Sequence, residues 1–334
     1  ARADLDTVAH RDGWVLPVGP AKILTQIVRK LTETPSGLLI IVGALLGANF
    51  PIGKIASGAG VPGLVWAALL SVSAAAILGM WVILRGRRVA VDGQHLRYFA
   101  VTALTAYALP NTLVFAAIPH LGSGLTSVFY ALSPIVTLAF SALAGLRKPS
   151  QLELAGIMVG FAGALLVVSG RGEIGRPADL IWLAAGALVP VSLALGNVYR
   201  TLDWPDNADP LWLAVGSHVV TGVVLSAIAL MLFQPSEIGR VAAVPGAALA
   251  QAAASALMLP LFFRLQRVGG PVTLSQIGIV AAAVGVGIGA FVLGERYAAV
   301  VWIGVAVIAV GVGLTVIARM HDERTRKSDA EQAT

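Results

Sequence analysis

Long apolar runs separated by short polar breaks dominate the chain. There are ten such runs of about 20 residues, the length at which a helix crosses the roughly 30 Å hydrocarbon core of a bilayer. We expect helices, because a helix satisfies its own backbone hydrogen-bonding groups inside lipid. The predicted spans are 37–56, 62–84, 99–118, 122–144, 152–169, 178–199, 210–232, 244–263, 270–293 and 298–318.

Three apolar runs with short breaks between them occupy residues 99–169, and the same arrangement returns over residues 244–318. Shifts of 147 and 149 positions align residues of the first region with residues of the second. Each half holds five spans, and because this number is odd, the second half enters the membrane from the opposite side. We therefore predict an all-α membrane protein with two inverted five-helix repeats. The aligned residues are Phe115 with Phe262, Gly122 with Gly269, Thr126 with Thr273, and Gly145-Leu146-Arg147 with Gly294-Glu295-Arg296.

The repeats divide the chain into a short N-terminal segment, two five-helix halves and a C-terminal tail. Between residues 22 and 31, apolar residues fall on one helical face and basic or amide residues on the other. This pattern favours a helix on the inner membrane surface, with an unstructured basic tail as the alternative. No apolar core follows the basic start closely, so we do not expect a secretory signal peptide. The four parts are 1–36, 37–169, 178–318 and the charged tail 319–334.

Composition and charge support the membrane interpretation. Hydrophobic residues make up 57% of the chain and charged residues 12%, whereas soluble domains carry about 25% charged residues. The net charge is +6, but its distribution does not point to nucleic acid as a partner. With the N-terminus inside, 18 basic residues fall in inner segments and 5 in outer ones. The positive-inside rule therefore predicts a bacterial inner-membrane protein with both termini in the cytoplasm.

The sequence lacks the motifs of several chemistries. It contains no cysteine, which excludes disulfides and thiolate metal sites. It also contains no His-Glu-x-x-His motif, no paired aspartates within a span and no phosphate-binding P-loop. We therefore expect no metal and no cofactor, and an intramembrane enzyme or an ATP-driven pump is disfavoured.

Polar side chains recur at helical spacing inside the predicted spans. Tyr107 and Asn111 are four residues apart in the third span, and Tyr130 and Ser133 share a face of the fourth. Such residues face other helices or a water-filled cavity. We expect a substrate-binding role, with interhelical hydrogen bonding as the alternative. The remaining candidates for substrate binding are the amides Asn49, Asn197, Gln251 and Gln276.

Two further residues are candidates for proton coupling. His218 lies deep in the seventh span, and Glu295 lies near the edge of a span. The alternatives are a histidine that packs with its hydrogen bonds satisfied, and a glutamate that caps a helix or forms a surface ion pair. No Asp or Glu lies in the middle third of any predicted span. We therefore predict a largely neutral binding site and movement of solute down its own gradient, or by exchange.

Several short stretches resemble the EamA branch of the drug/metabolite transporter superfamily. The resemblance covers about residues 37–318, and its motifs are loose. Two positions depart from the pattern: Leu146 stands where a glutamate is usual, and Ala281 where a proline matching Pro134 is usual. The matching stretches are Gly47-Ala48-Asn49-Phe50-Pro51, Pro119-His120-Leu121-Gly122-Ser123-Gly124, Leu132-Ser133-Pro134 and Leu293-Gly294-Glu295-Arg296.

The resemblance implies export of small metabolites such as amino acids, without specifying one substrate. Together with the inverted repeat, it predicts a secondary transporter that works by alternating access without ATP. The alternative is a structural or scaffold subunit that keeps a transporter-like fold without transporting. The predicted partners are a small-molecule substrate and the lipid bilayer, and the oligomeric state stays open.

Overall fold

A computed structural model describes residues 34–86, 91–146, 150–170 and 179–332. Every regular element of these residues is helical, so the predicted all-α class is confirmed for them. The predicted surface helix between residues 22 and 31 lies outside the described residues. Part of the loop that follows the fourth span, 147–149, also lies outside them, as does most of the link between the predicted halves, 171–178.

Eight helices are long and apolar enough to cross a membrane, and they coincide with the first eight predicted spans. They are α2 (Pro35–Gly58), α3 (Gly63–Leu84), the continuous α4, η1 and α5 (Gly93–Leu121), the continuous α6, η2 and α7 (Ser123–Leu143), α8 (Gln151–Ser169), α9 (Leu180–Leu202), α10 (Pro210–Leu232) and α12 (Pro245–Ser275). The ninth and tenth predicted spans correspond to shorter apolar helices: α13 (Ile277–Phe291) and the first half of α14 (Ala299–Gln332). A short α11 (Pro235–Ile238) and η3 (Gly239–Ala243) connect α10 to α12.

Glycines in unusual backbone conformations separate consecutive helices. Gly122 has φ +81 and lies between α5 and α6. Gly270 has φ +71 and interrupts α12, directly before Pro271. A residue with a Cβ atom adopts such positive φ values at a cost, so glycine is favoured at both turns. The end of α12 beyond Gly270 therefore belongs structurally to the ninth predicted span.

The outer surface of the helices is apolar. Leu143, Leu180 and Met231 each expose more than 80% of their surface. In water such a surface would promote aggregation, whereas lipid tails are an equally apolar solvent. The exposed side chains and the helix lengths together define a membrane-spanning protein.

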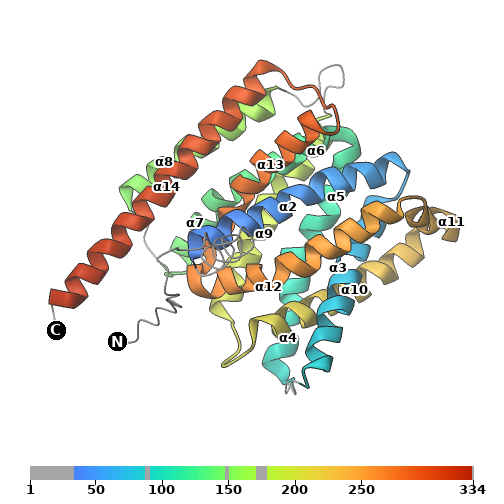
Figure 1. Ribbon diagram of the computed structural model, residues 1–334, viewed down its shortest axis with the longest axis horizontal. Helices are drawn as coiled ribbons and strands as arrows, with labels where there is room; N and C mark the ends of the chain where they lie inside the picture. Colours follow the sequence, from blue (N-terminus) through green and yellow to red (C-terminus); the bar gives the residue numbers. More distant parts are fainter. Residues whose placement is uncertain (1–33, 87–90, 147–149, 171–178, 333–334) are drawn as a thin grey trace, which may run out of the picture.

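Helices α8 and α14 pack along each other at one side of the molecule (Figure 1). Glycines make this close approach possible. A Cβ atom on Gly311 would lie 2.4 Å from the backbone nitrogen of Gly160, and one on Gly304 would lie 2.6 Å from the carbonyl oxygen of Gly163. Small residues at spacings near one helical turn are the usual device for close helix packing in lipid. Gly160 and Gly163 therefore lie at the contact between the two helices.

The other helices surround a common centre. α2 packs against α12 and α13, α3 packs against α10, and α9 packs against η1, α5 and α7. Elements from the two predicted halves are thus interleaved, because α2, α3 and α5 each contact helices from the second half. The polar residues predicted from the sequence lie at this centre.

Candidate functional site

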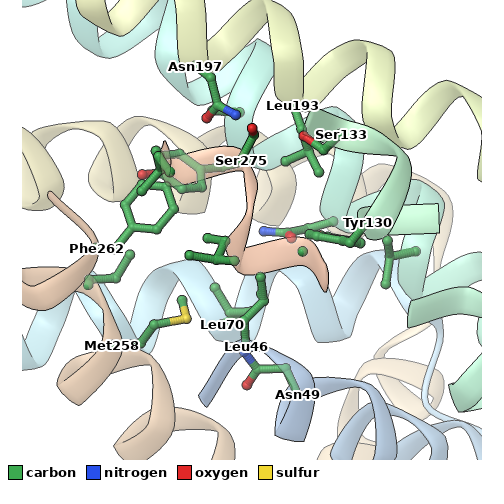
Figure 2. Close-up of a pocket in the computed structure, with 18 of the residues that line it drawn as sticks. Leu46, Asn49, Leu70, Tyr130, Ser133, Leu193, Asn197, Met258, Phe262 and Ser275 are labelled. Atoms are coloured by element: carbon green, nitrogen blue, oxygen red, sulfur yellow. The ribbon is translucent and has the colours of Figure 1, made fainter. Parts of the chain in front are cut away.

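A small cavity of about 70 Å³ lies between the helices. Its walls come from both ends of the chain: α2 and α3 from the first half, α9, α10 and α12 from the second, and the broken fourth and ninth spans. Figure 2 shows side chains from these helices converging on the same space, with Asn49, Asn197 and Phe262 on different sides of it. Most of the lining is apolar, with a few polar groups, as in typical small-molecule sites.

The third span changes its helical geometry where it lines the cavity. Residues Ala103–Ala108 form a π-helical segment, and Pro110 follows in α5. Proline lacks a backbone N–H, which disrupts regular helical hydrogen bonding at this point. The hydroxyl of Ser192 donates a 2.6 Å hydrogen bond to the carbonyl oxygen of Thr105 in the π-helical segment. π-helical turns are frequent at functional sites, and here one carries Tyr107.

The fourth and ninth spans are also interrupted at the cavity. The 3₁₀ segment η2 (Phe129–Leu132) separates α6 from α7, and Gln276 separates the end of α12 from α13. The two breaks touch, because a Cβ atom on Gly278 would lie 2.2 Å from the carbonyl oxygen of Tyr130. Both Tyr130 and Gly278 line the cavity. Discontinuous spans at a central site are typical of secondary transporters.

Six of the eight predicted substrate-binding residues line the cavity. They come from α2, the third span, the fourth span and α9. They are Asn49, Tyr107, Asn111, Tyr130, Ser133 and Asn197. The stripes predicted on the third and fourth spans therefore do face one space.

Gln251 and Gln276 do not belong to the described lining. The side chain of Gln251 accepts a hydrogen bond from Trp66 Nε1 at 3.3 Å and donates one to Asn49 Oδ1 at 2.7 Å. It thereby joins α12 to α2 and α3, which is the interhelical role given as the alternative. Gln276 is buried at the break in the ninth span, and its Nε2 has no hydrogen-bond partner in the described structure.

A residue that the sequence reasoning missed, Arg200, also lines the cavity. Its side chain is 1% exposed. Nη1 donates to the hydroxyl of Tyr107 at 3.2 Å, and Nη2 donates to Asn197 Oδ1 at 2.6 Å. The guanidinium lies 4.9 Å from the ring centre of Phe262. Nε has no hydrogen-bond partner, and in the described part of the chain no ion pair joins Arg200 to a carboxylate.

Arg200 corrects two predictions. The expected span ended at residue 199, which placed Arg200 in an inner loop, but α9 continues to Leu202. The predicted largely neutral site is wrong, since a guanidinium forms part of the cavity wall. The helical spacing of Asn197 and Arg200 was the available signal, because residues three apart share a helical face.

His218 faces the same cavity from α10. Its ring lies 4.2 Å from that of Tyr107, centre to centre. Both ring nitrogens are buried without a hydrogen-bond partner in the described structure. The histidine therefore packs against its neighbours, as the alternative expected, but among the described residues its ring nitrogens have no hydrogen-bond partner.

Glu295 lies away from the cavity and is fully surrounded by partners. It sits between α13 and α14 and is 5% exposed. Oε1 accepts the backbone N–H of Ser123 at 2.9 Å, and Oε2 accepts the Ser123 hydroxyl at 2.9 Å and the backbone N–H of Gly124 at 3.2 Å. The Tyr297 hydroxyl also donates to Oε2, and Lys54 Nζ lies 3.6 Å from Oε1.

These contacts define the charge state of Glu295. Burial raises the pKa of its carboxyl group, but the hydrogen bonds from Tyr297, Ser123 and Gly124 outweigh this effect and lower the pKa below its ordinary value. A carboxylate that accepts several N–H and O–H bonds is stabilised in its ionised form. Glu295 is thus a cap and a buried ion-pair partner, rather than the surface pair considered from the sequence.

Comparison with known proteins gives a match in the first half of the chain. Residues 35–169 match the model of the EamA-like transporter family, which agrees for this part with the resemblance seen over residues 37–318 of the sequence. Proteins of Escherichia coli K12 and O157:H7, each described as an uncharacterized inner membrane transporter, YedA, are 32% identical to the chain over 139 residues. The match includes 41% of this chain and spans less than half, 44%, of those relatives.

The fold extends further than the sequence match. One solved crystal structure superposes on 83% of this chain and 98% of its own, with a TM-score of 0.56 and 18% sequence identity. At this identity the likeness concerns the fold alone. It includes regions of this chain beyond residues 35–169.

Proposed function

We propose that the whole chain is a secondary transporter of small metabolites that works by alternating access without ATP. The observation that carries the proposal is the central cavity, which is lined by both halves of the chain and by interrupted spans. The match of residues 35–169 to the EamA-like transporter family and the transporter name of the E. coli relatives agree with it. A scaffold protein has no need for polar side chains gathered around a shared internal space.

The proposed architecture is ten spans in two inverted repeats, 37–169 and 178–318. Backbone details support it. Gly145 and Gly294, aligned by the 149-residue shift, have the same φ of +69. Thr126 and Thr273, aligned by the 147-residue shift, each bond to the carbonyl oxygen four residues earlier, in Gly122 and Gly269.

The break positions agree with the same alignment. Phe129, where η2 begins, and Gln276, where the ninth span is interrupted, are 147 residues apart. Equivalent breaks in two halves that meet at the cavity are the arrangement expected when two repeats rock against each other around a fixed site.

The proposed orientation places both termini in the cytoplasm of a bacterial cell. Burial of Arg200 removes one charge from the inner set, but the excess of inner basic residues remains. Single cysteines at Arg85 and Arg240 test this arrangement in intact cells. We expect an impermeant thiol reagent to label position 240 and not position 85; the reverse result would overturn the orientation.

Transport is proposed to be outward and facilitative, or by exchange, with small polar or amphipathic metabolites as substrates. Of the two proton-coupling candidates, Glu295 is held by five groups away from the cavity. His218 reaches the lining but is packed against Tyr107. We therefore expect a His218→Ala variant to keep pH-independent transport.

The test is uptake of a mixed metabolite pool into proteoliposomes, read by mass spectrometry. We expect wild-type protein to move a small set of solutes, and Ser133→Trp, which fills the cavity, to move none. Val292→Trp is the matched control, because Val292 is 73% exposed at the outer surface. If wild-type and Ser133→Trp vesicles are equal for every solute, the scaffold alternative is favoured instead.

A further inference from the structure

We propose that Arg200 is the recognition residue for a small organic monoanion, a carboxylate attached to an apolar body. This inference rests on the proposed transport function and specifies its substrate class. The guanidinium has five N–H donors, and in the described structure two hydrogen bonds to protein groups are present, both to neutral partners. Its Nε donor is free.

A buried cation without a counter-charge is costly to the protein. Taking an ion out of water costs several kcal/mol unless an opposite charge and hydrogen bonds compensate. Tyr107 and Asn197 supply hydrogen bonds but no negative charge, and the ring of Phe262 supplies only a weak electrostatic attraction. The missing negative charge is what a bound anion brings.

The lining also defines what else the ligand carries. Among the described lining residues, Arg200 is the one with a permanent charge. The site therefore favours a ligand with a single negative charge. No Asp or Glu occurs in this lining, so an ammonium group would be buried without a counter-ion. A zwitterionic amino acid therefore fits less well than a monocarboxylate. The apolar walls, which include Met258 and Leu193, suit a hydrocarbon or aromatic body.

The geometry of the guanidinium favours a carboxylate. A planar fork of N–H donors matches two carboxylate oxygens, whereas lysine offers a single charged point. Arg200→Lys should therefore keep attraction for anions and lose much of the affinity. Arg200→Gln should lose both.

The charge of the ligand also affects the direction of transport. A membrane potential of 100 mV, inside negative, shifts the distribution of a monoanion outward by about 50-fold. Release of a monocarboxylate then needs no coupling ion, which agrees with the well-partnered state of Glu295. An imposed inside-negative potential should speed efflux of the anion and leave a neutral solute unaffected.

The experiment measures heat stability of purified protein in detergent with phenylacetate, its neutral analogue phenylacetamide, the zwitterion phenylalanine, and phenyl phosphate. We expect phenylacetate to raise the melting temperature, and the other three to do so only at concentrations at least about tenfold higher. Short straight-chain carboxylates and their amides repeat the comparison with a different apolar body.

Two variants localise the effect. Arg200→Gln should weaken phenylacetate binding by at least about tenfold and leave the stability of the ligand-free protein unchanged or higher, because an uncompensated charge is removed. Arg97→Gln is the matched control, since Arg97 pairs with Asp203 and its side chain is 63% exposed. Arg97→Gln should bind as the wild type does.

The outcomes separate this inference from the proposed function. Binding of carboxylates without vesicle transport would support the recognition site and overturn transport. Transport of neutral solutes or zwitterions, unchanged by Arg200→Gln, would support transport and overturn the recognition site. Absence of stabilisation by every carboxylate tested would also overturn the recognition site, as would equal stabilisation by the amides.

Discussion

Two buried charged residues of this protein, Glu295 and Arg200, differ in their partners. Glu295 accepts hydrogen bonds from Ser123, Gly124 and Tyr297 and lies 3.6 Å from the ammonium group of Lys54. Arg200 is equally buried, but among the described residues it has two neutral hydrogen-bond partners and none at Nε. A compensated charge holds helices together, whereas an uncompensated one is tolerated where a ligand supplies what is missing.

The largest loss of stability is expected when Glu295, the charge with several partners, is removed. Glu295→Ala removes the acceptor of four hydrogen-bond donors and the ion-pair partner of the Lys54 ammonium group. We predict a loss of about 3–5 kcal/mol in the free energy of unfolding, measured by denaturation in mixed micelles. Asp206→Ala, which removes an exposed carboxylate, is the control and should cost little. A loss below about 1 kcal/mol at Glu295 would remove the contrast with Arg200.

A second change sharpens the comparison without altering a charge. A Cβ atom on Gly289 would lie 2.4 Å from Oε2 of Glu295, whereas one on Gly287 meets no atom within 4 Å. Gly289→Ala should therefore displace the carboxylate and destabilise the protein by about 1–3 kcal/mol. Gly287→Ala, on the same helix, should have almost no effect. Equal effects of the two changes would mean that the carboxylate is not held as described.

The pH dependence of stability provides a third test. Because folding lowers the pKa of Glu295, its contribution is present above the unfolded-state pKa, near 4.5. It is lost as the pH falls below that value through the folded-state pKa. The groups that contact the carboxylate are Lys54, Tyr297, Ser123 and the backbone N–H of Gly124. The Glu295→Gln variant should lack this part of the loss of stability in acid. If the dependence of stability on pH is the same as in the wild type, the contribution assigned to the Glu295 carboxylate is contradicted.

The smallest loss of stability is expected at an ion pair whose arginine lies at the surface. Arg97 pairs with Asp203, and hydrogen bonding to this guanidinium, the largest influence, lowers the pKa of the Asp203 carboxyl group. Surface pairs contribute about 0–1 kcal/mol. Asp203→Asn should thus cost less than 1 kcal/mol, and high salt should abolish the difference from wild type. A larger cost would show that exposure is a poor guide to the value of a charge in this protein.

Much of the fold could be predicted from the sequence because apolar runs of span length are a strong physical signal. Spans one to eight correspond to described helices. The break at Gly270 was harder to locate, since proline and glycine neighbours mark a turn without fixing which residue adopts positive φ. The shift of 147 aligns Gly122 with Gly269, which lies one residue before the glycine that adopts positive φ.

The site was only partly predictable. Helical spacing correctly brought Tyr107, Asn111 and Tyr130 to one cavity. It misassigned Arg200, because a charged residue near the end of an apolar run resembles a membrane-boundary anchor. It also could not separate Gln251, which joins helices, from Asn49, which reaches the lining, because both are amides within spans.

The most direct test of the central claim is to give Arg200 the counter-charge it lacks. Asn197→Asp is nearly isosteric and places a carboxylate at the position from which Oδ1 now accepts a 2.6 Å hydrogen bond from Nη2. The measurement is the melting temperature with and without phenylacetate. We predict a more stable ligand-free protein that phenylacetate no longer stabilises, since the internal carboxylate takes its place. A variant no more stable than wild type, and still stabilised by phenylacetate, would contradict the role assigned to Arg200.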